Sequence, residues 1–183
     1  MQTRHPSGPQ LTSTLGRLGE RKLKNENLID KLLLSNPFHR AMIEYLLLVG
    51  TGILGLFLSW SKLPFFPMLN IVGGILISSG FLSHVYIGKD HKQAHEKSAD
   101  IVKIVNNGGF SKIRHPLYLT AIIINLGIAL AFGIVLTLLI AMGSIFHWIM
   151  TALKEEEFLL QKFGEDYRQY RKNVRWRFLP GIF

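Results

Sequence analysis

The sequence contains no cysteine, and acidic residues are scarce, with 12 Asp and Glu against 21 Lys and Arg. Without cysteine the chain has no disulfide framework, no thiolate metal site and no cysteine nucleophile. The shortage of acidic residues leaves a net charge of +9, which is typical of proteins that bind nucleic acid or an anionic membrane surface. Because 48% of the residues are nevertheless hydrophobic, apolar and charged residues must occupy separate parts of the chain.

Long apolar stretches favour the membrane. A membrane-spanning helix needs about 20 apolar residues, and such stretches occur at 41–60, 68–88 and 117–153. The last is too long for one span, and Ala131-Phe132-Gly133 divides it into helices at 117–132 and 134–153 joined by a very short turn. We therefore predict an all-α integral membrane protein with about four transmembrane helices.

The basic residues lie in three segments that flank these spans. Residues 1–40 carry seven Lys and Arg, 89–116 carry six and 154–183 carry seven, and the remaining one is Lys62. Cytoplasmic segments of membrane proteins are enriched in Lys and Arg, so we predict that both termini are cytoplasmic. Because the charge is distributed over three membrane-flanking segments, we expect membrane lipid as a partner and no nucleic acid.

The chain divides into a basic N-terminal segment, 1–40, and one membrane domain, 41–183, whose tail at 154–183 is predicted to be cytoplasmic. About the first 20 residues begin with a Pro-, Gly- and Ser-rich stretch and are predicted to be disordered. Apolar residues at helical spacing in 25–34 predict a short interfacial helix.

Several ionisable residues lie at or near membrane depth, where such groups usually face the bundle interior or a wet cavity. They are Glu44, His84 and His147, although Glu44 and His84 fit a position near the interface equally well. His91 and His95 have the i, i+4 spacing of helical metal ligands, but no third ligand is evident, so we predict solvated loop residues and no metal site.

Two patterns of small residues predict helix packing. The stretch from Gly50 to Gly55 matches the G-x-G-x-x-G dinucleotide pattern, but it lies inside a spanning helix with no strand before it. Ala121, Asn125, Ala129 and Gly133 recur every four residues and define a narrow face for a neighbouring helix, with Asn125 as an interhelical hydrogen bonder.

Two charged segments flank the predicted hairpin of the third and fourth spans. Arg114-His115-Pro116 precedes it, and Lys154-Glu155-Glu156-Glu157 follows it. Two antiparallel spans return the chain to the face that it left, so the segments meet in one layer. Carboxylates at such a boundary are costly unless a cation is near. Arg114 can be that cation in a structural ion pair, and a bound cationic ligand is the alternative.

Together these segments resemble the isoprenylcysteine carboxyl methyltransferase and phospholipid methyltransferase superfamily of integral-membrane enzymes. The resemblance covers about the last 75 residues, where a G-x-Y-x-x-x-R-H-P-x-Y segment, a helical hairpin and an E-E segment follow in order. The matching residues are Gly108, Phe110, Arg114, His115, Pro116 and Tyr118, then Glu155, Glu156, Leu159, Phe163, Gly164, Tyr167, Tyr170 and Pro180. Phe110 replaces the usual tyrosine, and no acceptor-side pattern of the isoprenylcysteine branch precedes Gly108.

The resemblance implies S-adenosylmethionine as cofactor, with catalytic roles for Arg114 and Glu156. The implied cofactor-binding residues are Gly108, Phe110, Arg114, His115, Pro116, Tyr118, Glu155 and Glu156. Carboxylates can accept hydrogen bonds from an ammonium or ribose, Arg114 can hold a carboxylate through two nitrogens, and Phe110 or Tyr118 can face adenine or sulfonium. The amphipathic tail, with Phe163, Tyr167 and Tyr170 on one face, is expected to lie along the membrane interface and cover the site.

The function implied by the resemblance is methyl transfer to a lipophilic acceptor, with the carboxylate of an isoprenylcysteine-like group as first choice. An ionised carboxylate needs no general base. A phospholipid amine, or a small-molecule amine, thiol or phenol, is the alternative acceptor; an amine or thiol needs deprotonation, for which His115, Glu156 and His147 are candidates. The sequence is also compatible with a nicotinamide-dependent membrane reductase and with a non-enzymatic membrane scaffold.

Overall fold

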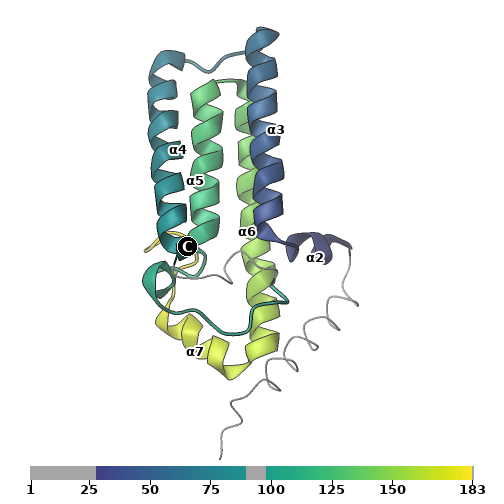
Figure 1. Cartoon of the computed structure of the whole chain (residues 1–183), viewed down its shortest axis with the longest axis vertical. Coiled ribbons are helices and arrows are strands. Elements are labelled where there is room, and N and C mark those ends of the chain that lie inside the picture. The colour runs from purple at the N-terminus through teal and green to yellow at the C-terminus, as the bar shows by residue number, and fades with distance from the viewer. Residues whose placement is uncertain (1–27, 90–97, 183) are drawn as a thin grey trace, which may run out of the picture.

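The computed structural model of the chain describes residues 28–89 and 98–182. In these two ranges the regular elements are helical, apart from an isolated bridge between Lys62 and Ile134. Four helices form an elongated bundle, and shorter helices gather at one of its ends (Figure 1). The disorder predicted for about the first 20 residues and the loop positions of His91 and His95 lie outside the described residues.

The four bundle helices are α3 (Pro37–Phe57), α4 (Phe66–Lys89), α5 (Pro116–Phe132) and α6 (Val135–Phe163). Three of them, α3, α4 and α6, are long and apolar enough to cross a membrane, and α5 is a shorter apolar helix. The helices coincide with the four predicted spans, although α3 begins earlier than predicted, at Pro37, where Asn36 caps the helix by accepting a hydrogen bond from the Phe38 amide.

The central helix of the bundle is α5, which contacts α3, α4 and α6. It approaches α4 so closely that a Cβ atom at Gly73 would lie 2.4 Å from the backbone nitrogen of Ala131. Ala121, Asn125 and Ala129 are buried, as predicted for a packing face. Helix α3 also approaches α5 closely, because a Cβ atom at Gly52 would lie 2.3 Å from the Phe132 ring. The dinucleotide-like pattern therefore serves helix packing at this position.

The turn between α5 and α6 positions the site. α5 is followed by Gly133 in the left-handed conformation, with φ of 62°, and α6 begins two residues later. Glycine adopts this conformation without steric cost, so the chain reverses at the predicted break. Because α6 has 29 residues and α5 has 17, α6 extends about 18 Å beyond the start of α5.

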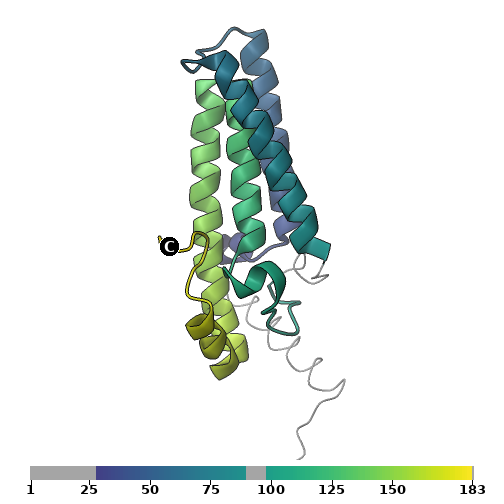
Figure 2. The same ribbon diagram turned by 90° about the vertical axis from the view of Figure 1, so that its left-hand side faces the viewer.

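The extension corrects the length of the fourth helix, which hydropathy predicts to end with the span at 153. The helix continues to Phe163, and Lys154–Phe163 contains five charged residues, so this part lies outside the apolar, membrane-spanning part of α6. Three shorter helices lie at this end of the bundle: α2 (Leu28–Leu33), the 3₁₀ helix η2 (Gly108–Ser111) and α7 (Glu165–Asn173) (Figures 1 and 2). The α3–α4 connection, which carries Lys62, lies at the opposite end.

Candidate functional site

The two charged segments meet where α6 projects beyond α5. His115 caps α5 and Pro116 is its first residue, while Glu155 and Glu156 lie on the projecting part of α6. Glu156 Oε1 is 2.8 Å from Arg114 Nε. This contact confirms the prediction that the segments share one layer. Of the two alternatives for the cation, Arg114 forms the ion pair with Glu156.

Glu156 lies at the centre of a buried ion cluster. Its Oε1 atom also lies 3.2 Å from His115 Nε2 and accepts a hydrogen bond from Arg177 Nε at 3.1 Å. Burial alone would raise the pKa of this carboxyl, but the hydrogen bonds and charges of His115 and Arg114 outweigh it and lower the pKa to about 2. Glu156 is therefore ionised, and its carboxylate is paired with Arg114, His115 and Arg177.

Arg114 fixes the C-terminal segment Val174–Arg177 against the start of α5. Its Nη1 atom donates to the carbonyl oxygens of Val174 at 2.8 Å and Arg175 at 2.7 Å. The backbone amides of Arg114 and His115 donate to Trp176 and Arg177 carbonyls. Arg114 is 8% exposed, and a buried guanidinium needs such partners. The arrangement differs from the predicted clamp, because Nε and Nη1 already bind the protein.

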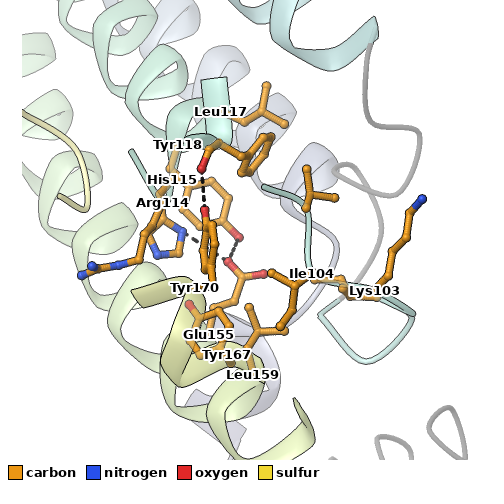
Figure 3. A pocket seen from close by; sticks show the side chains of 13 residues that line it. Lys103, Ile104, Arg114, His115, Leu117, Tyr118, Glu155, Leu159, Tyr167 and Tyr170 are labelled. Carbon is orange, nitrogen blue, oxygen red and sulfur yellow. Dashed lines mark hydrogen bonds and ion pairs between the residues drawn. The ribbon is translucent and has the colours of Figure 1, made fainter. Parts of the chain in front are cut away.

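Glu155 points in another direction from its neighbour, because successive residues of a helix are about 100° apart. Its carboxylate accepts hydrogen bonds from the Tyr118 hydroxyl at 2.7 Å and the Ser98 hydroxyl at 3.1 Å. His115 Nδ1 lies 3.6 Å away. Figure 3 shows Glu155, Tyr118 and His115 gathered around one cavity.

This cavity is called the polar cavity below because the polar residues Lys103, Arg114, His115 and Glu155 line it, although most of its lining surface is apolar. It encloses about 680 Å³ of empty space, part of it open to solvent. Five predicted cofactor-binding residues line it: Phe110, Arg114, His115, Tyr118 and Glu155. Three do not. Gly108 begins η2 with φ of 55°, Pro116 is buried as the first residue of α5, and Glu156 holds Arg114 from outside the cavity.

The tail of the chain closes one side of the polar cavity. Tyr167 and Tyr170 of α7 line it, and the Tyr170 hydroxyl donates to the Phe110 carbonyl oxygen at 2.9 Å. Burial raises the pKa of both phenols well above the usual value, so they remain hydrogen-bond donors. The prediction that the aromatic tail covers the site is confirmed for these two residues.

Part of the lining of the polar cavity was not predicted from the sequence. Leu159 belongs to the family pattern but had no predicted role, and Ile101, Lys103, Ile104 and Val105 were not singled out. A signal was present in the sequence, because Ile101–Val105 is apolar apart from Lys103 and lies within a polar connection. Such a run predicts contact with the rest of the protein but does not indicate which part.

A second cavity, called the apolar cavity below, lies beside the first. It encloses about 850 Å³ of empty space, part of it open, and Leu117 and Tyr118 line both cavities. Its remaining lining comes mainly from α3, α4 and α5: Pro37, Phe38, Ala41, Met42, Tyr45, Phe81, His84, Ala121, Ile124 and Trp148. Of the three ionisable residues predicted at membrane depth, His84 lines this cavity.

Glu44 and His147 line neither cavity but join three helices in a polar network. Glu44 accepts hydrogen bonds from Asn125 Nδ2 and Trp148 Nε1, each at 2.7 Å, and lies 2.6 Å from His147 Nδ1. His147 Nε2 lies 3.2 Å from Arg40 Nη1. The predicted role of Asn125 as an interhelical hydrogen bonder is confirmed, and His147 does not reach the cavities where a general base would act.

These features define a helical integral membrane protein with a polar cavity and an apolar cavity at one end of its bundle. The chain belongs to the phospholipid methyltransferase family, whose sequence model matches residues 67–166, more than half of its length. The match covers α4, the α5–α6 hairpin and the paired glutamates, and it confirms the superfamily predicted from the two charged segments. The protein is therefore a membrane methyltransferase. A comparison with curated proteins finds no match.

Proposed function

We propose that this methyltransferase moves the methyl group of S-adenosylmethionine to a lipophilic acceptor. The supporting observation is that the polar cavity and the apolar cavity meet at Leu117 and Tyr118. A polar cofactor and a hydrocarbon-bearing substrate need different surroundings. Their reacting atoms must nevertheless come into contact, which requires two binding sites that adjoin each other. Leu117 and Tyr118, which line both cavities, mark the place where the two sites adjoin.

The chemistry of the polar cavity suits S-adenosylmethionine, which presents an ammonium, a carboxylate, two ribose hydroxyls, an adenine and a sulfonium. Glu155 would accept hydrogen bonds from the ammonium or the ribose, and Arg114 and Lys103 provide positive charge for the carboxylate. The rings of Phe110 and Tyr118 provide faces for the adenine or the sulfonium. When bound, the cofactor supplies an electrophilic methyl group.

The chain itself contributes alignment and the exclusion of water. Tyr118 lines both cavities, and its side chain is held by the hydrogen bond to Glu155 and by the His115 ring, which stacks on it with centroids 5.3 Å apart. A fixed ring beside the place where cofactor and acceptor meet would restrict their angle of approach, and such alignment lowers the barrier of a direct displacement. We propose that this is the main catalytic role of the protein.

The acceptor is proposed to enter the apolar cavity between α3 and α4 with its hydrocarbon part. The sequence resemblance places the carboxylate of an isoprenylcysteine-like group first, and the family description names phospholipids. The apolar lining suits the hydrocarbon chain of either. The cofactor is proposed to enter from the cytoplasm, on the side where Lys103, Arg114 and Arg177 lie.

Mass spectrometry of lipids tests this function. Purified protein is incubated with a lipid extract, an isoprenylcysteine analogue and isotope-labelled S-adenosylmethionine. We expect the label in one acceptor class, and we expect Glu155→Gln to abolish the labelling while Glu157→Gln, on the exposed side of α6, retains it. Folded protein that labels nothing and gains thermal stability from NADPH but not from S-adenosylhomocysteine would support a reductase and overturn the proposal.

A further inference from the structure

The chain beyond α7 exposes apolar side chains that the proposed function does not use. Residues 176–182, called the C-terminal arm below, have no helix or strand. Trp176 is 37% exposed, Leu179 46% and Ile182 77%, whereas Phe178 is buried. The arm therefore turns one large side chain toward the protein and three away from it.

Backbone contacts place the arm at the height where the apolar helix α5 begins. The Arg114 amide donates to the Trp176 carbonyl oxygen at 2.9 Å. The His115 amide, one residue before α5 starts, donates to the Arg177 carbonyl oxygen at 3.0 Å. Figures 1 and 2 both show the C-terminus at this end of the bundle, above α7. The arm thus returns from α7 toward the membrane-spanning helices.

Phe178 extends the arm to the depth of those helices. It belongs to one buried cluster with Ala41, Ala121 and Trp148, which lie on α3, α5 and α6. Ala121 is about 8 Å along α5 from its first residue. The residues that follow Phe178 therefore start at a depth where the apolar helices enter the bilayer. At that depth an exposed side chain on the outside of the bundle contacts lipid.

The composition of the arm and of the residues before it suits an anionic membrane surface. Tryptophan is enriched at the membrane–water interface. Lys172 and Arg175, which precede the arm, are exposed, so positive charge lies next to the apolar side chains. Such a combination binds the interface through apolar burial together with attraction to anionic headgroups.

The arm is also joined to the polar cavity. Arg177 donates to Glu156 at 3.1 Å, and the Phe178 ring lies 5.8 Å from the His115 ring. Arg114 and His115, whose amides hold the arm, both line the polar cavity. A change in the position of the arm therefore changes the wall of that cavity.

We propose that the C-terminal arm inserts into the headgroup layer of an anionic bilayer and that this contact holds the polar cavity in its binding form. Lipid is the occupant because the arm continues the apolar surface of the bundle at the depth where that surface enters the membrane. Two ligands that favour the same position of one segment raise each other's affinity. The effect on the cofactor rests on the proposed function, to which it adds regulation by lipid charge.

Spin labelling measures the depth of the arm without any cofactor. The chain has no cysteine, so Leu179→Cys introduces a single site for a nitroxide. In nanodiscs of phosphatidylcholine with about 30% phosphatidylglycerol, oxygen, which concentrates in lipid, should relax this label more than a water-soluble nickel chelate does. Gln161→Cys, on the exposed side of the charged part of α6, should show the reverse. Ile182→Cys replaces Leu179→Cys if that variant does not fold.

Titration of S-adenosylhomocysteine into unlabelled protein in nanodiscs tests the coupling. The wild type should bind about fivefold more tightly with phosphatidylglycerol present than in phosphatidylcholine alone. Arg175→Gln removes one exposed charge beside the arm and should lose most of this gain. Arg168→Gln removes a charge that already pairs with Glu165 at 3.0 Å, so it should keep the gain. The gain should shrink at about 0.5 M salt, because salt screens exposed charges.

The outcomes separate the arm from the proposed function. A label at Leu179 that the nickel chelate reaches as readily as the label at Gln161 overturns the membrane contact. A label at Leu179 that neither agent reaches indicates a second copy or another protein on the arm, and it overturns the contact as well. A label in lipid with equal affinities in both nanodiscs overturns the regulation alone. Absence of binding in either nanodisc overturns the proposed function.

Discussion

At the scale of single residues, the two adjacent glutamates of α6 serve different purposes. Glu156 is 3% exposed and lies beside Arg114, His115 and Arg177, so it holds together the segments that build the site. Glu155 faces the polar cavity and holds Tyr118. Under the proposed function, Glu156 would act on the cofactor through the positions of its neighbours, whereas Glu155 lines the cavity proposed to hold it.

The stability of the protein should depend on pH through Glu156. Its pKa is lowered from 4.5 to about 2 in the folded state, so the stability that it contributes is fully present above pH 4.5 and is lost as the pH falls toward 2. We expect the melting temperature in detergent to fall between pH 5 and pH 3, and to fall less steeply in Glu156→Gln. Glu157→Gln should follow the wild type, and equal slopes in all three proteins would contradict this role.

Most of the residues at the site were predictable from the sequence, but which of them face the cavity and which hold the surrounding segments together was not. Arg114, His115, Tyr118 and Glu155 belong to the family pattern, so their presence was predictable. The helical phase that directs Glu155 into the cavity and Glu156 toward Arg177 depends on how α6 packs. The position of Ile101–Val105 in the cavity wall was not predicted, because a connection without helical or strand periodicity gives no indication of which residues it contacts.

At the scale of elements, the α5–α6 hairpin determines the site. Gly133 has φ of 62°, a conformation that costs other residues roughly 1–2 kcal/mol. Gly133→Ala should therefore lower the free energy of unfolding by about 1–2 kcal/mol, measured by chemical denaturation in detergent. Gly143→Ala is the matched control, because a Cβ at Gly143 would have no atom within 4 Å. Equal stability of the two variants would contradict the role of the turn.

The contact between α4 and α5 gives a second matched pair of glycines. A Cβ at Gly73 would lie 2.4 Å from the backbone of α5, whereas one at Gly74 would have no atom within 4 Å. Gly73→Ala should push the helices apart and cost about 1–3 kcal/mol, while Gly74→Ala should be neutral or slightly stabilising. Thermal unfolding of both variants in detergent tests this, and a Gly73→Ala protein as stable as the wild type would contradict the close approach.

The boundaries of the elements show where hydropathy succeeds and where it fails. The break at Gly133 and the start of α5 were predicted because a glycine and a proline stand there. The end of α6 was predicted ten residues too early, because hydropathy detects the apolar part of a helix and not its charged continuation. That continuation carries Glu155 and Glu156, so the part of the helix that was not predicted is the part that forms the site.

At the scale of the whole molecule, the functional parts are gathered at one end of the bundle. The start of α5, the end of α6, α7 and the C-terminal segment meet there (Figures 1 and 2). The predicted basic segments contribute to the same end, since Arg114, Arg177 and Lys103 all lie at the site. One face of the membrane thus presents the polar cavity, and we propose that it is the cytoplasmic face.

The absence of cysteine makes this orientation directly measurable. Ser61→Cys places a thiol in the exposed α3–α4 connection, and Ser111→Cys places one in η2 at the opposite end. A membrane-impermeant maleimide added to intact cells should label Ser61→Cys, and Ser111→Cys only after the membrane is opened. The reverse pattern would contradict the cytoplasmic placement of the site.

The α5–α6 hairpin is proposed to assemble a binding site for an adenosyl cofactor, and calorimetric titration of S-adenosylhomocysteine into purified protein tests this directly. We predict saturable one-to-one binding that Glu155→Gln weakens by about 10- to 100-fold, the worth of a hydrogen bond to a charged group, and that Glu157→Gln leaves unchanged. Absence of binding to the folded wild-type protein, or equal affinity in all three proteins, would show that the hairpin forms no such site.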